Sequence, residues 1–246
     1  MRPIDKKNIG EEVILNTGEK IVIEASYHPY HAAKPALVAT IGSYCSYCEN
    51  AYSYNWDLHV EHVQPKGLPE YASLEFQWSN FLLSCATCNG KGQKGAKNVI
   101  LTDIHLPHQN NTFLSLVYKD GGVVTVNPAL KGNSFTHASN LINIVGLNRS
   151  PKESSQGDTR WRKRQNDWNK AKIFLGKYLA GKIDVDTIIE LVKTGGGWSI
   201  WFTVFKGQDE VLSRLISDFP GTCATCFDKH NHYEPLPRNP EQDDPI

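Results

Sequence analysis

Two Cys-x-x-Cys pairs constrain this chain more than any other feature of its sequence. Cys45 and Cys48 form the first pair, Cys85 and Cys88 form the second, and residues 49–84 lie between them. The two-residue gap within a pair lets both sulfurs face the same ion, so four thiolates can satisfy one tetrahedral Zn²⁺. The interval between the pairs is long for a minimal zinc finger. If all four cysteines bind one ion, residues 49–84 must form a sizeable structural unit between the two halves of the zinc site.

The alternative interpretation of these cysteines is a set of buried apolar thiols or a redox pair. All 6 cysteines fall into Cys-x-x-Cys pairs, the third being Cys223/Cys226. The charged N-terminal residues predict a cytoplasmic location, and no apolar run reaches the roughly 20 residues that cross a membrane. Paired cysteines in a reducing compartment favour metal binding over disulfides, so zinc is the preferred interpretation of the first two pairs.

Composition indicates an ordered globular chain without a general attraction to nucleic acid. The 246 residues are 40% hydrophobic and 21% charged, as in ordinary folded proteins. Lys and Arg number 26, Asp and Glu also number 26, and the formal net charge is zero. Any binding of a polyanion must therefore depend on local basic patches.

The segment between the pairs carries a carboxylate, an imidazole and an amide. Glu61-His62 lies in the run Leu58–Val63, whose alternation indicates a strand, and Asn80 and Asn89 follow. Neighbours on a regular strand point to opposite faces, so we expect a twist or a bulge at Glu61-His62. A carboxylate and an amide oxygen suit a hard ion such as Mg²⁺. A neutral imidazole can take a proton from water near neutral pH.

One known family shares this order of residues. The chain resembles the HNH endonucleases in the series Glu61-His62, Asn80, Cys85-x-x-Cys88-Asn89, Lys91 and Gly92. The resemblance implies a ββα-metal core in which His62 is the general base, with Glu61 and Asn89 as ligands of a catalytic Mg²⁺ or Mn²⁺. It also implies that Asn80 braces the loop carrying His62. The family more often has Asp where this chain has Glu61.

Shorter matches outside the motif resemble one branch of that family. They are Tyr44–Glu49, Asn110–Thr112, Gly146–Asn148 and Phe219–Thr222. Similar segments occur in the HNH subunit of Septu and retron-associated anti-phage systems, where it is paired with an ABC-type ATPase. The resemblance implies hydrolysis of phosphodiester bonds, with DNA favoured, and an ATPase partner. An RNA-cleaving enzyme and a non-catalytic zinc-bearing adaptor for nucleic acid or the ATPase remain alternatives.

The remaining patterns predict a mixed α+β chain with a zinc-braced core. We divide it into an N-terminal arm and lead-in helix at 1–42, an HNH nuclease core with the four-cysteine zinc site at 43–128, a helical extension at 129–222, and a Cys/His segment with a mobile proline-rich tail at 223–246. Helical spacing and end signals predict helices near 32–41, 134–147, 158–181, 184–197 and 208–219. Asp120-Gly121-Gly122 predicts a hairpin turn.

Two groups of basic residues are candidate phosphate contacts. Lys91, Lys94 and Lys97 follow Asn89 directly. The helix near 158–181 begins with a second group, consisting of Arg160, Arg162, Lys163 and Arg164. The alternative for the helical group is a solvated or partner-facing surface.

Several histidines and the third cysteine pair form weaker patterns. Cys223, Cys226, His230 and His232 are a candidate second metal site, although the two histidines are closer together than in an ordinary finger. His59, three residues before His62, is a candidate extra ligand or a solvent-facing strand residue. His28-x-x-His31 and His105-x-x-His108 are interpreted as surface or core histidines.

Overall fold

The computed structural model describes residues 1–52, 57–149 and 158–246. Within them the chain combines eight α-helices with four two-stranded antiparallel sheets, which confirms the predicted mixed α+β class. The strands are β1 (Glu12–Ile14), β2 (Lys20–Val22), β3 (Leu58–His62), β4 (Phe81–Cys85), β5 (Leu116–Lys119), β6 (Val123–Val126), β7 (Phe227–Asp228) and β8 (Glu234–Pro235). The helices are α1 (Lys34–Ile41), α2 (Ala86–Asn89), α3 (Thr112–Ser115), α4 (Gly132–Val145), α5 (Arg160–Leu179), α6 (Val185–Gly195), α7 (Trp198–Val204) and α8 (Asp209–Ser217).

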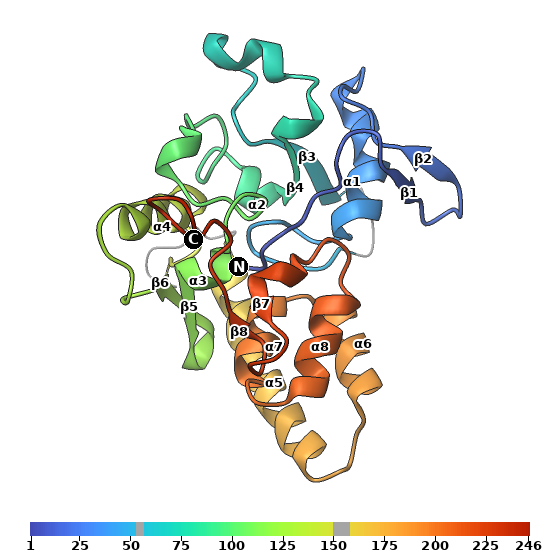
Figure 1. Ribbon diagram of the computed structural model, residues 1–246, viewed down its shortest axis with the longest axis vertical. Helices are drawn as coiled ribbons and strands as arrows, with labels where there is room; N and C mark the ends of the chain where they lie inside the picture. The colour runs from blue at the N-terminus through green and yellow to red at the C-terminus, as the bar shows by residue number, and fades with distance from the viewer. Residues whose placement is uncertain (53–56, 150–157) are drawn as a thin grey trace.

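Strands β3 and β4 with helix α2 occupy one half of the molecule, beside α1, whereas α5–α8 fill the other half (Figure 1). The β3/β4 pairing runs from Leu58 opposite Cys85 to His62 opposite Phe81 without an extra residue. The alternative of a bulge at Glu61-His62 is therefore wrong, because the ladder stays regular through both residues. Strand β4 is buried along its whole length, and α2 begins directly after it.

Helix α1 brings the chain to the first cysteine pair. Pro35 occupies its first turn, where a missing N–H costs nothing, and Gly42 ends it with φ of 80°. The helix was predicted at 32–41, and its first two residues instead belong to a 3-10 turn, Tyr30–Ala33. Its apolar residues, including Leu37 and Ile41, are buried against the core.

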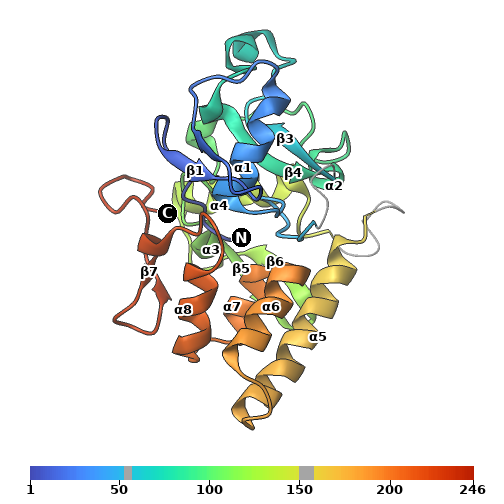
Figure 2. The same cartoon turned by 90° about the vertical axis from the view of Figure 1, so that its right-hand side faces the viewer.

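Helices α5, α6, α7 and α8 lie side by side (Figure 2). Helix α7 is mainly apolar and its first five residues are buried, with Trp198 stacked on Phe202 at a centroid distance of 4.7 Å. Gly196 allows the close approach of this layer to the first cysteine pair, because a Cβ there would lie 2.2 Å from the Glu49 carbonyl oxygen. The Glu49 carboxylate in turn accepts from the Ser199 backbone N–H at 3.0 Å. The helical half is thereby attached directly to residues that flank the cysteines.

The tail was expected to be mobile, yet its described residues contact the body of the protein. Ile246 is buried, and its carbonyl oxygen accepts from the Asn111 backbone N–H at 3.1 Å. Arg238 donates to the Ile4 carbonyl at 2.8 Å. Composition indicated mobility because proline and acidic residues carry little apolar surface, whereas polar contacts to distant segments hold this tail. Among the described residues, no helix has both the length and the apolar character needed to span a bilayer.

Candidate metal centre and catalytic cleft

The four cysteines of the first two pairs converge as predicted. Their sulfur atoms lie within 4.8 Å of one another and all four residues are buried. The Cys48 and Cys85 sulfurs are 3.8 Å apart, and a tetrahedral ion with Zn–S distances near 2.3 Å needs about 3.8 Å between sulfurs. Hydrogen bonds among the thiols lower the pKa of Cys85 and raise the pKa of Cys48 and Cys88, so without an ion the negative charge lies mainly on Cys85. This cluster could therefore bind zinc.

The surroundings of the cysteine cluster also favour negatively charged sulfur. The Cys88 backbone N–H points to the Cys85 sulfur at 3.5 Å. The Arg160 guanidinium donates to the Cys88 sulfur at 3.2 Å. Both groups stabilise thiolate charge, as donors to metal-bound sulfur do.

A small open cleft next to the cluster collects the residues for which the sequence suggested chemistry. Glu61, His62 and Asn89 line it together with Lys66 and Lys94, and its volume is about 190 Å³. Glu61 and His62 come from the end of β3, and Asn89 is the last residue of α2. On a regular strand the side chains of Glu61 and His62 point to opposite faces. Both nevertheless line this cleft, because it lies where β3 ends and the chain turns. The structure thus brings the predicted base and both predicted ligands to one cavity.

His62 is half-buried at the edge of this cleft with a defined tautomer. Its Nε2 lies 2.8 Å from the Glu75 carbonyl oxygen. A carbonyl oxygen can only accept, so Nε2 carries the proton and Nδ1 carries the lone pair. Burial lowers the pKa of His62, which keeps the imidazole neutral near neutral pH. Tyr30 and Phe81 pack edge-on against the ring at centroid distances of 4.8 and 5.2 Å.

Asn80 connects the loop after His62 to the segment before β4. Its Oδ1 accepts from the Gln64 backbone N–H at 2.8 Å, and its Nδ2 donates to the Gln64 carbonyl at 2.9 Å. A third contact runs from Nδ2 to the Leu74 carbonyl at 3.3 Å. Because Asn80 is buried, these backbone groups have little access to water as a substitute. The arrangement fits the bracing role that the resemblance implies.

Glu61 is paired with Lys94 inside the protein. The Lys94 ammonium lies 2.7 Å from Glu61 Oε1, and the side chains are 2% and 1% exposed. Lys94 also donates to the His62 carbonyl. Burial raises the pKa of Glu61, and the Lys94 charge opposes this effect. Lys94 was predicted to hold phosphates, but its ammonium is instead committed to Glu61, because a buried carboxylate needs a counter-charge.

Two of the arginines predicted to contact nucleic acid are also buried. Arg160 forms an ion pair with Asp158 at 2.7 Å and contacts the sulfur of Cys88. The Arg164 Nε donates to the Gly122 carbonyl at 3.1 Å. The first turns of α5 pack against the cysteine cluster and the β5/β6 hairpin, so both guanidinium groups serve internal contacts. Sequence periodicity could not show the contacts with Cys88 and Gly122, because both residues are distant from α5 along the chain.

The other predicted basic contacts have more access to solvent. Lys91, Lys97 and Arg162 are exposed. Lys163 is partly buried and pairs with Asp167 at 2.6 Å. Lys91 and Lys97 flank the loop that reaches the cleft, and they remain candidates for phosphate contacts.

Sequence reasoning missed two residues beside the cleft. Lys66 lines it, pairs with the Glu75 carboxylate at 2.7 Å, and places its ammonium 4.2 Å from the centroid of Tyr30. Glu75 also supplies the carbonyl that orients His62. The position of Lys66, four residues after His62, was the available signal. Nothing local in the sequence marked Glu75.

The third cysteine pair does not gather the histidines that follow it. The sulfurs of Cys223 and Cys226 are 3.0 Å apart, and the hydrogen bond from Cys226 lowers the pKa of Cys223 to about 6. His230 is exposed, and His232 Nδ1 instead contacts Asp209 at 2.8 Å. The described part of the chain has two groups of three or more potential ligands within 4.8 Å, and this set is not one of them. His59 is exposed and does not line the cleft.

Comparison with known proteins gives one informative similarity. No family model matches the chain. The chain is 33% identical over 164 residues to the protein named "Retron Vc95 putative HNH endonuclease" from Vibrio cholerae serotype O1 biovar El Tor. The aligned region covers 61% of this chain and 77% of that relative.

Proposed function

The chain belongs to the HNH endonuclease family, and from this premise we propose that it is a metal-dependent endonuclease that hydrolyses phosphodiester bonds, with DNA as the favoured substrate. The observation that carries the proposal is the single cleft lined by Glu61, His62 and Asn89. The pairing of β3 with β4, followed directly by α2, supports the ββα-metal core that the motif implies.

His62 is the proposed general base. Its Nδ1 lone pair takes a proton from a water molecule, and the resulting hydroxide attacks phosphorus opposite the leaving 3′ oxygen. The hydrogen bond from Nε2 to the Glu75 carbonyl holds the ring and stabilises the imidazolium formed after proton transfer. Asn80 maintains the loop geometry on which the position of His62 depends.

Glu61 and Asn89 are the proposed ligands of a divalent ion. One carboxylate and one amide oxygen fit Mg²⁺ or Mn²⁺. The Lys94 ammonium already pairs with Glu61 Oε1, so the ion would bind through the remaining carboxylate lone pairs. When bound, the ion would polarise the phosphate and stabilise charge on the leaving oxygen. Lys66 lines the cleft and its side chain is 38% exposed, so its ammonium, which pairs with Glu75, can also contact a substrate phosphate.

Zinc at the cysteine cluster has a separate, structural role in this proposal. Cys85 ends β4 and Cys88 lies in α2, so an ion bound there fixes the start of the helix that ends at Asn89. The same cluster contacts Arg160 of α5. Zinc would therefore hold the ligand-bearing helix and the helical extension in one arrangement.

The proposed biological setting follows from the similar protein and from the flanking matches. The name of the Vibrio relative assigns it to a retron, and the short flanking matches resemble HNH subunits that pair with an ABC-type ATPase. We extend both to this chain as the nuclease effector of an anti-phage complex. A cytoplasmic location belongs to the same proposal, because a reducing compartment keeps the 6 free cysteines available for metal.

The test compares cleavage by two histidine variants. Plasmid DNA and single-stranded RNA are incubated with Mg²⁺ or Mn²⁺ and the protein, alone and with its ATPase partner. His62→Ala should abolish cleavage. His59→Ala is the matched control, because this residue lies on the same strand but is exposed and outside the cleft, and its activity should equal wild type.

Each outcome has a defined meaning. Equal cleavage by wild type and His62→Ala would refute the mechanism. If only RNA were cleaved, with the same dependence on His62, the substrate would be RNA and not DNA. No cleavage of either substrate in the presence of the partner would favour the adaptor.

A further inference from the structure

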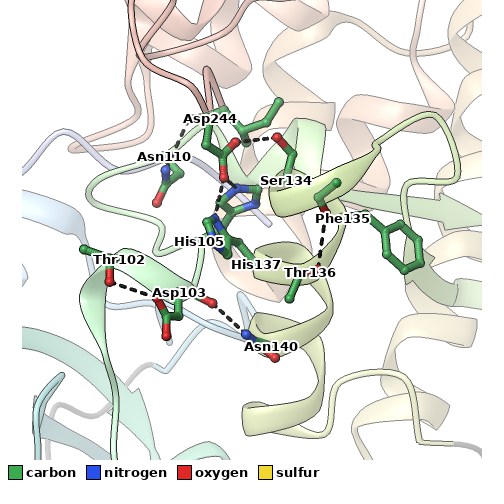
Figure 3. A network of polar contacts seen from close by, with 12 residues as sticks. Thr102, Asp103, His105, Asn110, Ser134, Phe135, Thr136, His137, Asn140 and Asp244 are labelled. Atoms are coloured by element: carbon green, nitrogen blue, oxygen red, sulfur yellow. Dashed lines mark hydrogen bonds and ion pairs between the residues drawn. The ribbon is translucent and has the colours of Figure 1, made fainter.

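A second group of metal-binding side chains lies away from both the cleft and the cysteine cluster. His105 follows the 3-10 turn Leu101–Asp103, His137 belongs to α4, and Asp244 comes from the tail. One ring nitrogen of each histidine and a carboxylate oxygen lie within 4.8 Å of one another. Figure 3 shows both rings turned towards the Asp244 carboxylate. Three distant segments thus supply one ligand each.

Asp244 Oδ2 is the point where the three side chains meet. It lies 2.8 Å from His105 Nε2 and 2.5 Å from His137 Nδ1. The two rings are almost perpendicular, at 86°, so their nitrogens approach from different directions. Ligand atoms of a tetrahedral zinc site lie about 3.3 Å apart. An ion therefore needs the carboxylate to withdraw by less than about 1 Å, a shift available to one side chain.

Two of the proposed ligands, His105 and Asp244, are each oriented by a hydrogen bond with a serine. Ser115 Oγ, which is buried, lies 2.8 Å from His105 Nδ1. Without an ion, Nε2 carries the proton because the Asp244 carboxylate can only accept, and Nδ1 accepts from the Ser115 hydroxyl. With an ion at Nε2, the proton would lie on Nδ1 and be donated to the Ser115 oxygen. Ser134 donates to the second carboxylate oxygen of Asp244 at 2.6 Å. Such outer hydrogen bonds orient metal-binding imidazoles and carboxylates.

The charge at this place also favours a cation. Over residues 1–52, 57–149 and 158–246, the ion-pair contacts of Asp244 are to His105 and His137, and no Lys or Arg pairs with it. This partly buried carboxylate is therefore without a permanently charged basic partner among the described residues. The three residues line an open pocket of about 720 Å³, so an ion and a water molecule can reach them.

We propose that His105, His137 and Asp244 bind a divalent transition-metal ion, with Zn²⁺ as the preferred ion, and that this ion clamps the tail onto α4. Two imidazoles and a carboxylate suit zinc, with water as the fourth ligand. The same residues explain why a polar, proline-rich tail is held in place. None of the three lines the cleft of Glu61 and His62, so the clamp and the proposed nuclease can fail independently.

The first test measures zinc in the full chain, purified with its affinity tag removed. Asp244→Asn and His137→Gln should each lose about one zinc per chain relative to wild type. Asp243→Asn is the matched control, because Asp243 is the exposed neighbour of Asp244 in the same pocket. Ser134→Ala removes a hydrogen bond to Asp244 but no ligand, and it should retain the metal.

The second test separates loss of metal from loss of folding. Added Zn²⁺ should raise the Tm of metal-depleted wild type and Asp243→Asn, with a smaller rise for Asp244→Asn, since only the cysteine cluster would remain to bind zinc. The Cys85→Ser variant should still show a rise in Tm when Zn²⁺ is added, because the site at Asp244 is intact. Adding Asp244→Asn to this variant should abolish that rise. Equal zinc content in wild type, Asp244→Asn and Asp243→Asn, with equal responses to Zn²⁺, would overturn the proposal and leave a hydrogen-bonded cluster.

Discussion

Replacing Lys94 with Met tests the buried ion pair at the centre of the cleft. The charges of Lys94 and Glu61 are 2.7 Å apart with almost no exposure. At an effective dielectric constant of about 20 their attraction is about 6 kcal/mol, part of which offsets desolvation. Removing one partner of a buried pair costs roughly 3–5 kcal/mol, because the other charge stays buried. Lys94→Met should therefore lower the free energy of unfolding by about that amount at pH 7.

The direction of the pH dependence follows from Glu61. Burial already raises the pKa of Glu61, and loss of the Lys94 charge raises it further. The folded variant then binds a proton that the unfolded chain releases, so its stability deficit should shrink as the pH falls towards 5. Glu61→Gln combined with Lys94→Met removes both charges and should recover most of the loss. Mn²⁺ should stabilise Lys94→Met but not the double variant.

Chemical denaturation followed by tryptophan fluorescence measures these differences by linear extrapolation. Lys91→Met is the matched control, because this exposed lysine lies three residues before Lys94 and should cost less than about 0.5 kcal/mol. If Lys94→Met were as stable as Lys91→Met, the argument that Glu61 depends on an internal counter-charge would be wrong. A double variant no more stable than Lys94→Met would also contradict the pairing.

Three further predictions concern other parts of the structure. Cys85→Ser should lower zinc content by about one ion per chain and reduce stability by several kcal/mol, measured by elemental analysis and denaturation; unchanged values would exclude the four-thiolate site. Burial lowers the pKa of His108 to about 3, so its contribution to stability is complete above pH 6.5 and is lost as the pH falls towards 3. His108→Phe should lower the slope of stability against pH in that range by up to about 1.4 kcal/mol per unit, and equal slopes would refute the assignment. Asn80→Ala leaves the backbone of Gln64 unpaired and should cost about 2–3 kcal/mol with a matching loss of cleavage, whereas a stable, active variant would remove its bracing role.

Local sequence patterns predicted the elements that depend on nearby residues. The turn at Asp120-Gly121-Gly122 joins β5 to β6, and Asp184 caps α6 by accepting from the Thr187 backbone N–H at 2.9 Å. These outcomes were predictable because turn geometry and helix capping are determined within a few residues. The expectation of a bulge in β3 failed because alternation describes a strand in isolation. Alternation does not show that the cleft lies at the end of β3, where both Glu61 and His62 can line it without a bulge.

The sequence by itself determined which chemical groups are present and which of them must meet. The spacing within the two cysteine pairs, and the order of Glu61-His62 and Asn89, indicated a thiolate cluster beside a separate oxygen-donor site. The tertiary structure decided which charges are free to act. Lys94 pairs with Glu61, Arg160 contacts the cysteine cluster, and Asp244 reaches His105 from the far end of the chain. These contacts join distant segments, and burial selects the partners of a charge only when the whole chain has folded.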